Sequence, residues 1–165
     1  MSERENMEVL PSVMRTLWYE SSDGRTHISQ ADVLAKEEPV VILGEAGMGK
    51  SHLLKWLADH PGYAFCTARQ LINRRDPQTI LGTAQTIVID ALDEVSSQRD
   101  GDAVDLVLRR LGELEYPRFI LSCRVADWWG ATSLEAIQEQ YPKTTLEMHL
   151  NAFDKDDSER GGREN

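Results

Sequence analysis

The chain has 165 residues, of which 41% are hydrophobic and 28% charged, and 28 acidic against 18 basic side chains give a formal net charge of −10. This length suits one domain of ordinary size around one hydrophobic core. No stretch reaches the roughly 18 consecutive apolar residues of a membrane span, and the N-terminus lacks a secretion signal, so we expect a cytoplasmic protein without membrane contact. The acidic balance argues against a general nucleic-acid surface, because nucleic acids are polyanions.

Residues 1–37 are predicted to form an N-terminal extension that contains one short helix. The sequence Ser-Ser-Asp-Gly at 21–24 is typical of a turn. Ser29 followed by Asp32, with apolar residues around them, is typical of a capped helix, and Pro39 sets a limit to its length.

From residue 38 onward, short apolar runs alternate with helical patterns. The runs predict strands at 40–43, 63–67, 86–90, 118–123 and 144–150. The helical spacing of apolar residues predicts helices at 50–59, 69–74, 102–113 and 132–141. This alternation predicts a three-layer α/β fold over residues 38–153, in which helices cover both faces of a five-stranded, mostly parallel sheet. Residues 154–165 contain no apolar side chain, so we expect a disordered charged tail.

Cysteine and histidine residues give no sign of a metal or redox site. Cys66 and Cys123 lie in apolar runs without CxxC or CxxH spacing, so we expect buried thiols in a reducing compartment. A catalytic thiol is the alternative, and it requires a histidine nearby in the fold. The four histidines show no metal-ligand spacing, and we expect no chemistry from their side chains.

A glycine-rich segment lies between the strand predicted at 40–43 and the helix predicted from Lys50. It fits the pattern G-x-x-x-x-G-K-[ST] in the strand-to-helix context that this pattern requires, which disfavours an accidental glycine-rich turn. Glycines allow backbone N–H groups to surround phosphate oxygens, Lys50 supplies a positive charge, and the Ser51 hydroxyl is a ligand for Mg²⁺. The predicted nucleotide-binding residues are Gly44, Glu45, Ala46, Gly47, Met48, Gly49, Lys50, Ser51 and His52.

An acidic segment follows the strand predicted at 86–90. Asp90 closes this strand 40 positions after Lys50 (90 − 50), where a carboxylate holds Mg²⁺ opposite a phosphate-binding loop. Asp93 and Glu94 are close enough in sequence to polarise an attacking water. The alternative is an ordinary strand end followed by a solvated acidic loop, and the spacing from Lys50 counts against it.

The strand predicted at 118–123 is followed directly by Arg124. A cation in this place senses or stabilises the γ-phosphate, whereas the alternative is a surface arginine that pairs with a local acid such as Asp127. The aromatic pair that follows has two interpretations: Trp128 and Trp129 either stack on a base or partner or pack against the sheet.

Together these motifs resemble the P-loop ATPases of the signal-transduction class called STAND, and within it the NACHT family, over residues 38–150. NACHT proteins place a small residue after the metal-binding aspartate and an acidic pair two positions further, as residues 90–94, Asp-Ala-Leu-Asp-Glu, do here. The strand ending in Ser122-Cys123-Arg124 is similar to the third motif of the family. The resemblance implies ATP as the nucleotide, a phosphate role for Lys50, and metal roles for Ser51 and Asp90. It also implies a sensor role for Arg124 and the strand order 5-1-4-3-2. STAND proteins hold the adenine ring upstream of the glycine-rich loop, so Trp18 with Tyr19 either contacts the adenine or packs in the core.

Family members continue beyond the fifth strand into a helical lid, whereas this chain passes into its charged tail, as expected of a fragment or a natural short form. We therefore expect an ATP-binding, Mg²⁺-dependent NTPase core of a signalling or defence protein that hydrolyses ATP slowly. Its partners would be the nucleotide, further copies of itself or a larger multidomain homologue. The alternative is a non-catalytic nucleotide-binding or oligomerisation module. A small-molecule kinase is less consistent, because no arginine-rich insertion lies between the predicted strands.

Overall fold

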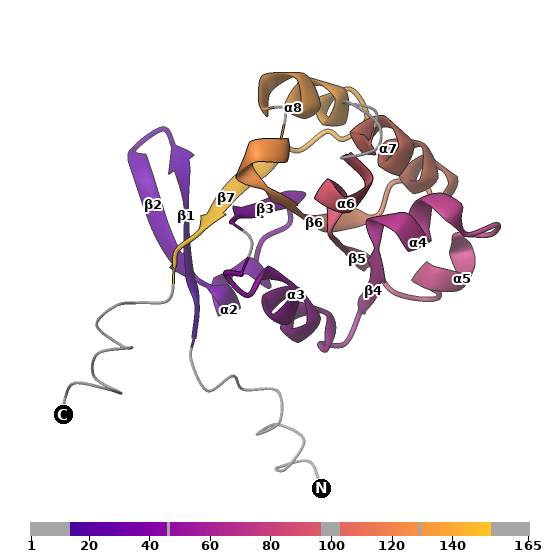
Figure 1. Cartoon of the computed structure of the whole chain (residues 1–165), viewed down its shortest axis with the longest axis horizontal. Coiled ribbons are helices and arrows are strands. Elements are labelled where there is room, and N and C mark those ends of the chain that lie inside the picture. The colour runs from indigo at the N-terminus through magenta and orange to yellow at the C-terminus, as the bar shows by residue number, and fades with distance from the viewer. Residues whose placement is uncertain (1–13, 46, 97–102, 129, 153–165) are drawn as a thin grey trace, which may run out of the picture.

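One mixed sheet of seven strands runs through the computed structural model, which describes residues 14–45, 47–96, 103–128 and 130–152 (Figure 1). The strand order is β2-β1-β7-β3-β6-β5-β4. The strands are β1 (Thr16–Ser21), β2 (Gly24–Ser29), β3 (Val40–Gly44), β4 (Tyr63–Thr67), β5 (Thr86–Asp90), β6 (Arg118–Arg124) and β7 (Leu146–Leu150). The tail at 154–165 and two residues of the predicted sites, Ala46 and Trp129, lie outside the described residues.

The five strands from β3 to β7 confirm the expected order, because β7-β3-β6-β5-β4 is 5-1-4-3-2 when these strands are numbered along the chain. All of their pairings are parallel. The expected total of five strands was wrong. The hairpin of β1 and β2 joins β7 antiparallel, with Leu17 opposite Leu150 and Trp18 opposite His149. These two strands are mostly polar and only partly buried, so they lack the continuous apolar runs that identify buried parallel strands.

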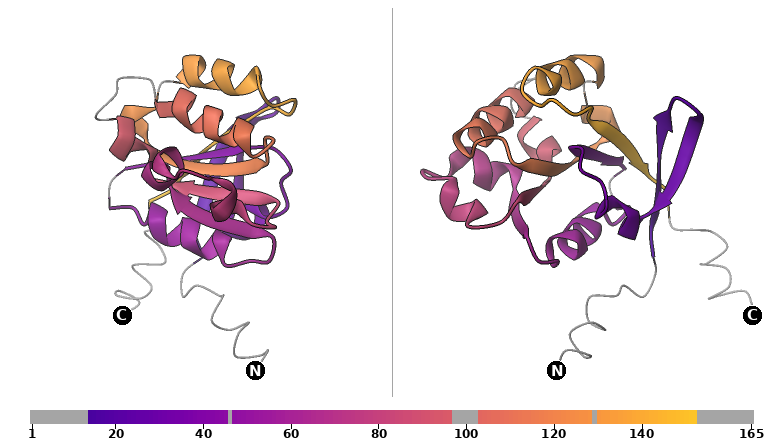
Figure 2. Two further views of the ribbon diagram at one scale, coloured as in Figure 1. Left: turned by 90° about the vertical axis from the view of Figure 1, so that its right-hand side faces the viewer. Right: turned by 180° about the vertical axis from the view of Figure 1, so that it is seen from behind.

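Helices cover both faces of the sheet and give the molecule three layers (Figure 2). On one face, α2 (Gln30–Val33) and α3 (Lys50–Ala58) pack in an apolar cluster with Ile42, Val88 and Met148. The cluster on the other face draws on α4, α6, α7 and α8, and α5 lies beside the edge strand β4. The bounds of these five helices are Ala68–Asn73 (α4), Gln78–Leu81 (α5), Leu92–Ser96 (α6), Ala103–Glu113 (α7) and Gly130–Gln138 (α8).

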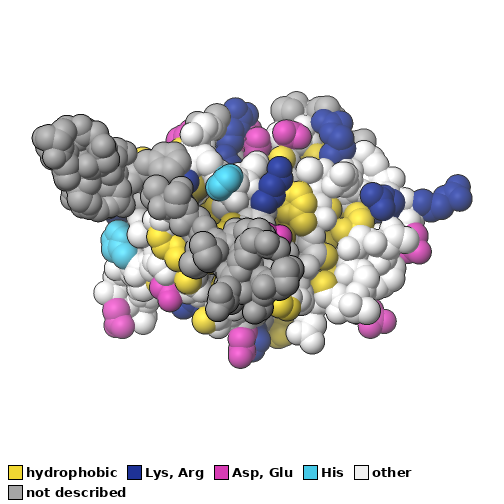
Figure 3. Space-filling model, turned by 90° about the horizontal axis from the view of Figure 1, so that it is seen from below, with side chains coloured by type: hydrophobic (Ala, Val, Ile, Leu, Met, Phe, Trp, Pro, Cys, Tyr) yellow, Lys and Arg dark blue, Asp and Glu magenta, His cyan; other side chains and the backbone are white. Residues whose placement is uncertain are grey.

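Local signals set several helix boundaries. At α2, the backbone N–H of Ser29 donates to Asp32 Oδ2 at 2.9 Å, which confirms the capping pattern. The start predicted for α8 was wrong, because this helix begins at Gly130 and Thr132 lies inside it. Among the described helices, none has the length and apolar character needed to cross a bilayer. On the face that Figure 3 shows, basic side chains lie among acidic and apolar ones.

Candidate functional site

The glycine-rich loop joins β3 to α3 at the side of the sheet formed by the C-terminal ends of the parallel strands, which we call the carboxyl edge of the sheet. Gly47 and Gly49 have φ values of 82° and 83°, in the left-handed region that other residues enter only with strain. Gly49 is also the residue that caps the N-terminus of α3. The first N–H groups of a helix have no acceptor within the helix, so this loop geometry suits an anion.

The Lys50 side chain folds back over this loop. Its Nζ donates to the carbonyl oxygen of Gly44 at 3.1 Å and to that of Glu45 at 3.4 Å. A Cβ added at Gly44 would lie in van der Waals contact with Lys50, 3.4 Å from its Cγ and Cδ atoms, so the stem of the lysine packs directly against this glycine. Phosphate oxygens bind an ammonium group more strongly than peptide carbonyls do, so these bonds can be exchanged for bonds to a phosphate.

Ser51 and Asp90 meet although they are far apart in the sequence. Ser51 Oγ donates to Asp90 Oδ2 at 2.6 Å, and Ser122 Oγ donates to the other oxygen, Oδ1, at 2.6 Å. Ser122 also accepts the backbone N–H of Ala91 at 2.9 Å. Asp90 is only 6% exposed and Ser122 is fully buried, so the carboxylate is fixed in orientation by side chains from α3 and β6.

Ser122 was missed by the sequence analysis as a partner of Asp90. The signal was available, because Ser122 is a polar residue within the apolar strand β6, and a fully buried hydroxyl requires a hydrogen-bond partner.

Ala91 has an unusual backbone conformation directly after Asp90. Its φ of 66° lies in the left-handed region, which costs a residue with a Cβ about 1–2 kcal/mol. This turn redirects the chain, so that α6 starts at Leu92 and carries Asp93 and Glu94 in its first turn. Strain of this kind next to a buried carboxylate is typical of functional sites.

Arg124 lies beside the loop, because it is paired with Gly44 across the β3–β6 ladder. Its guanidinium binds Asp127 Oδ2 at 2.8 Å and lies 3.6 Å from Asp93 Oδ2. The hydrogen bond and charge of Asp127, together with the charge of Asp93, raise the pKa of Arg124 above its ordinary value. The pairing with Asp127 that the sequence left as an alternative is therefore present, at a position that also adjoins the loop.

The residues at this edge fit a Mg²⁺ ion that is bound together with a phosphate. Within the described residues, no group of three or more His, Cys, Asp or Glu side chains could hold a metal ion by itself. Mg²⁺ in nucleotide sites takes one or two protein ligands and completes its shell with waters and phosphate oxygens. The hydroxyl of Ser51 and the carboxylate of Asp90, already in contact, are such a pair.

The remaining residues of the predicted segment contribute less to this geometry. Glu45 and His52 are exposed, and the Met48 sulfur accepts the backbone N–H of Glu45 at 3.0 Å. Cys66 and Cys123 are buried as expected, and burial raises the pKa of each thiol to about 12, which disfavours a nucleophilic thiolate.

Two of the tryptophans predicted as candidates for base binding, Trp128 and Trp18, contact other side chains of the protein. Trp128 packs against the core and donates from Nε1 to Glu147 Oε2 at 2.5 Å. Trp18 stacks on His149 with ring centroids 4.1 Å apart, and the Arg25 guanidinium lies 3.7 Å from the Trp18 ring centroid. The Trp18 ring is therefore engaged by an imidazole and a guanidinium of the protein itself.

No protein-family model matches the chain, and no curated protein sequence matches it. Among solved structures, AMPPCP-bound DnaA from Aquifex aeolicus is similar, with a TM-score of 0.45 and 16% identity over 72% of this chain and 43% of that one. A DNA replication initiation factor gives a TM-score of 0.49 and 14% identity over 74% of this chain and 44% of that one. A structure on katanin self-assembly gives a TM-score of 0.40 and 14% identity over 70% of this chain and 42% of that one.

The chain thus spans less than half the length of each of these structures. At such scores and identities, the similarity carries no conclusion about binding or activity. The strand order and the loop that joins β3 to α3 are those of a P-loop NTPase fold.

Proposed function

We propose that the chain binds ATP together with Mg²⁺ at the loop of residues 44–52, as the nucleotide-binding core of a STAND-class signalling or defence protein of the NACHT type. The observation that carries the proposal is the 2.6 Å hydrogen bond between Ser51 and Asp90. It brings the hydroxyl of the phosphate-binding loop and the carboxylate at the end of β5 into one site, as Mg²⁺-nucleotide binding requires.

The residues of the site have different roles in binding Mg-ATP. The loop N–H groups hold phosphate oxygens, and Lys50 exchanges its carbonyl partners for oxygens of the β- and γ-phosphates. Ser51 and Asp90 would hold Mg²⁺, which when bound neutralises phosphate charge. Ser122 keeps the Asp90 carboxylate in one orientation, so that little reorganisation accompanies binding.

Hydrolysis requires a group that orients water toward the γ-phosphate. Glu94 is exposed and Asp93 is 17% exposed beside Arg124, and we assign that task to one of these two carboxylates. The position of Arg124 opposite Gly44 supports a role for it near the γ-phosphate. The run of residues 90–94, with a small residue after the first aspartate, supports the NACHT type.

A second function, nucleotide binding without turnover, is favoured by one observation. Arg124 lies between Asp93 and Asp127, so two of the three proposed catalytic groups neutralise each other. A protein held in this arrangement would bind ATP and release no phosphate. Intact Mg-ATP binding without phosphate release over many hours selects this function over slow hydrolysis.

The test of the proposed function is a calorimetric titration of the purified chain with Mg-ATP. Removal of one charged hydrogen-bond donor in Lys50→Ala should weaken binding by about 10- to 100-fold. Lys55→Ala is the matched control, because Lys55 lies exposed on the same helix and should leave the Kd unchanged. Absence of binding by the wild type, or equal binding by Lys50→Ala, would overturn the proposal.

A further inference from the structure

Arg15 connects two backbone segments that are far apart in the sequence. It precedes β1 and is only 7% exposed. One guanidinium nitrogen, Nη1, donates to the carbonyl oxygen of Met48 at 2.6 Å, and the other, Nη2, donates to that of Asn151 at 2.8 Å. A single side chain therefore holds both the phosphate-binding loop and the chain that leaves β7.

At the loop, this bond fixes the peptide unit between Met48 and Gly49. The carbonyl of Met48 and the N–H of Gly49 belong to one planar trans peptide, so they point in opposite directions. By holding the carbonyl on its own side, Arg15 directs the Gly49 N–H to the other side. Gly49, whose φ is 83°, would otherwise allow this peptide to turn.

At the other end, Asn151 is the first residue after β7. Its backbone N–H donates to the Thr16 carbonyl at 3.0 Å, and its side-chain amide donates to Thr16 Oγ1 at 2.9 Å. With the bond from Arg15, the chain that leaves β7 is attached to the start of β1 at three points. A change in the direction of this segment would act on the Arg15 guanidinium.

The backbone of Arg15 is itself anchored to α2. Its N–H donates to Gln30 Oε1 at 2.7 Å, and the Gln30 N–H donates to its carbonyl at 2.9 Å, with Gln30 only 1% exposed. Burial also lowers the pKa of Arg15 from its ordinary value. A planar guanidinium is the side chain that can donate to two separate carbonyls in a fixed geometry.

We propose that Arg15 is a positioning residue for the nucleotide site and couples loop residues 47–49 to the chain that leaves β7; this inference rests on the proposed function. A nucleotide that orders the loop then stabilises the attachment of Asn151. By the reciprocity of coupled equilibria, displacement of the segment after β7 weakens nucleotide binding.

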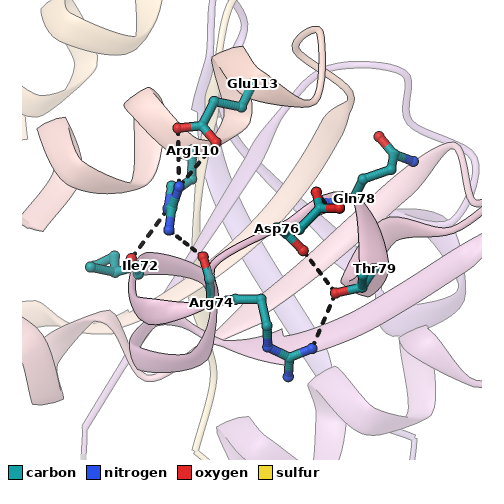
Figure 4. A network of polar contacts seen from close by, with 7 residues as sticks. All are labelled: Ile72, Arg74, Asp76, Gln78, Thr79, Arg110 and Glu113. Atoms are coloured by element: carbon teal, nitrogen blue, oxygen red, sulfur yellow. Dashed lines mark hydrogen bonds and ion pairs between the residues drawn. The ribbon is translucent and has the colours of Figure 1, made fainter.

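Arg110 provides a matched control, because it makes the same kind of contact away from the loop. Its guanidinium donates to the carbonyl of Ile72 at 3.2 Å and to the carbonyl of Arg74, and it binds Glu113 (Figure 4). A purely structural role for Arg15 would give the Arg15 and Arg110 variants the same behaviour: reduced stability with unchanged affinity for Mg-ATP.

The first experiment titrates Mg-ATP into Arg15→Ala, Arg15→Lys and Arg110→Ala. Arg15→Ala should raise the Kd by about tenfold, and Arg15→Lys should recover part of the loss, because an ammonium group can reach one of the two carbonyls. Arg110→Ala should bind as the wild type does. Wild-type affinity in a folded Arg15→Ala protein overturns this inference alone, whereas a wild type that does not bind Mg-ATP overturns the proposed function.

The second experiment needs no variant and applies even where Arg15→Ala fails to fold. Amide hydrogen exchange of the wild-type chain is measured with and without saturating Mg-ATP. The coupling predicts slower exchange at the Asn151 amide, which donates to Thr16. An exchange rate at Asn151 that does not change with Mg-ATP overturns the coupling.

Discussion

The edge of the sheet that carries Lys50 and the contact between α4 and α7 both use a cation bound to backbone carbonyls, but they differ in how complete their bonds are. Lys50 has two carbonyl partners at 3.1 and 3.4 Å, which a phosphate can replace. Arg110 has two carbonyls and both oxygens of Glu113, at 2.9 and 3.0 Å, as partners. The first region is suited to exchange partners and the second to keep them.

The surroundings of the two cations show the same difference. The polar network continues beyond Arg110. The Arg74 guanidinium donates to Thr79 Oγ1 in the first turn of α5, and that hydroxyl donates to the carbonyl of Asp76, two residues before α5 (Figure 4). Next to Lys50, by contrast, the exposed Ser51 contacts Asp90, and Asp90 is followed by Ala91 with its left-handed φ of 66°. We therefore expect substitutions near Lys50 to change binding more than stability, and substitutions at the α4–α7 contact to do the reverse.

The largest effect is expected for Asp90→Asn, which keeps the shape of the side chain and removes its charge. Loss of a metal-holding carboxylate should lower ATP hydrolysis by about 100-fold and remove the dependence of ATP binding on Mg²⁺. Phosphate release and ATP titrations with and without Mg²⁺ measure these two effects. Asp105→Asn, on the exposed side of α7, is the control. Wild-type Mg²⁺ dependence in Asp90→Asn would contradict the assignment.

Arg110→Ala tests the other side of the comparison. Removal of the guanidinium leaves two carbonyls at the end of α4 without this donor, so the free energy of unfolding should fall by about 1–3 kcal/mol. Urea unfolding measures the loss, and Mg-ATP titration should give the wild-type Kd. Arg109→Ala, an exposed neighbour, should leave both quantities unchanged. A weakened Kd in Arg110→Ala would show that the two regions are not independent.

The smallest effect concerns His149 on β7, between the hairpin and the site. Burial and the charge of Arg25 lower its pKa below the ordinary 6.5, against the opposing charges of Glu147 and Glu20. Below pH 6.5 the unfolded chain therefore binds more protons than the folded one. Above pH 6.5, His149 is neutral in both states and the free energy of unfolding does not depend on its titration. This free energy falls as the pH drops from 6.5 toward the lowered pKa of the folded state, and it stays at the reduced value at still lower pH. Urea unfolding from about pH 7 to about pH 5 should show a weaker dependence in His149→Gln. An equal pH dependence of the unfolding free energy in the wild type and in His149→Gln would contradict the lowered pKa of His149.

The sequence predicted the parts of this molecule that depend on local patterns. Continuous apolar runs identified the five parallel strands, and motif spacing predicted the proximity of Ser51 and Asp90, which are in contact. The hairpin of β1 and β2 was missed because its strands are partly exposed and polar. Helix α6 was missed because it is short and follows the left-handed turn at Ala91. No pattern of residues in this segment predicts a positive φ at an alanine.

The role of Arg15 could not be predicted for a different reason. It is a single arginine in a segment without a motif, and its carbonyl partners lie 33 and 136 positions away. Backbone carbonyls have no side-chain identity, so no sequence pattern can indicate that they are acceptors. Contacts of this kind depend on the folded topology alone.

The most direct test of the account is the free energy of unfolding measured as a function of Mg-ATP concentration. A ligand that binds only the folded chain stabilises it by about 2.7 kcal/mol at 100 times its Kd. At that concentration we expect this gain in the wild type and in Arg110→Ala, from its lower starting value, and a gain of only about 0.4–1.4 kcal/mol in Lys50→Ala, whose Kd is about 10 to 100 times higher. Equal unfolding free energies of the wild type with and without Mg-ATP would contradict the assignment of the loop at 44–52 as a nucleotide site.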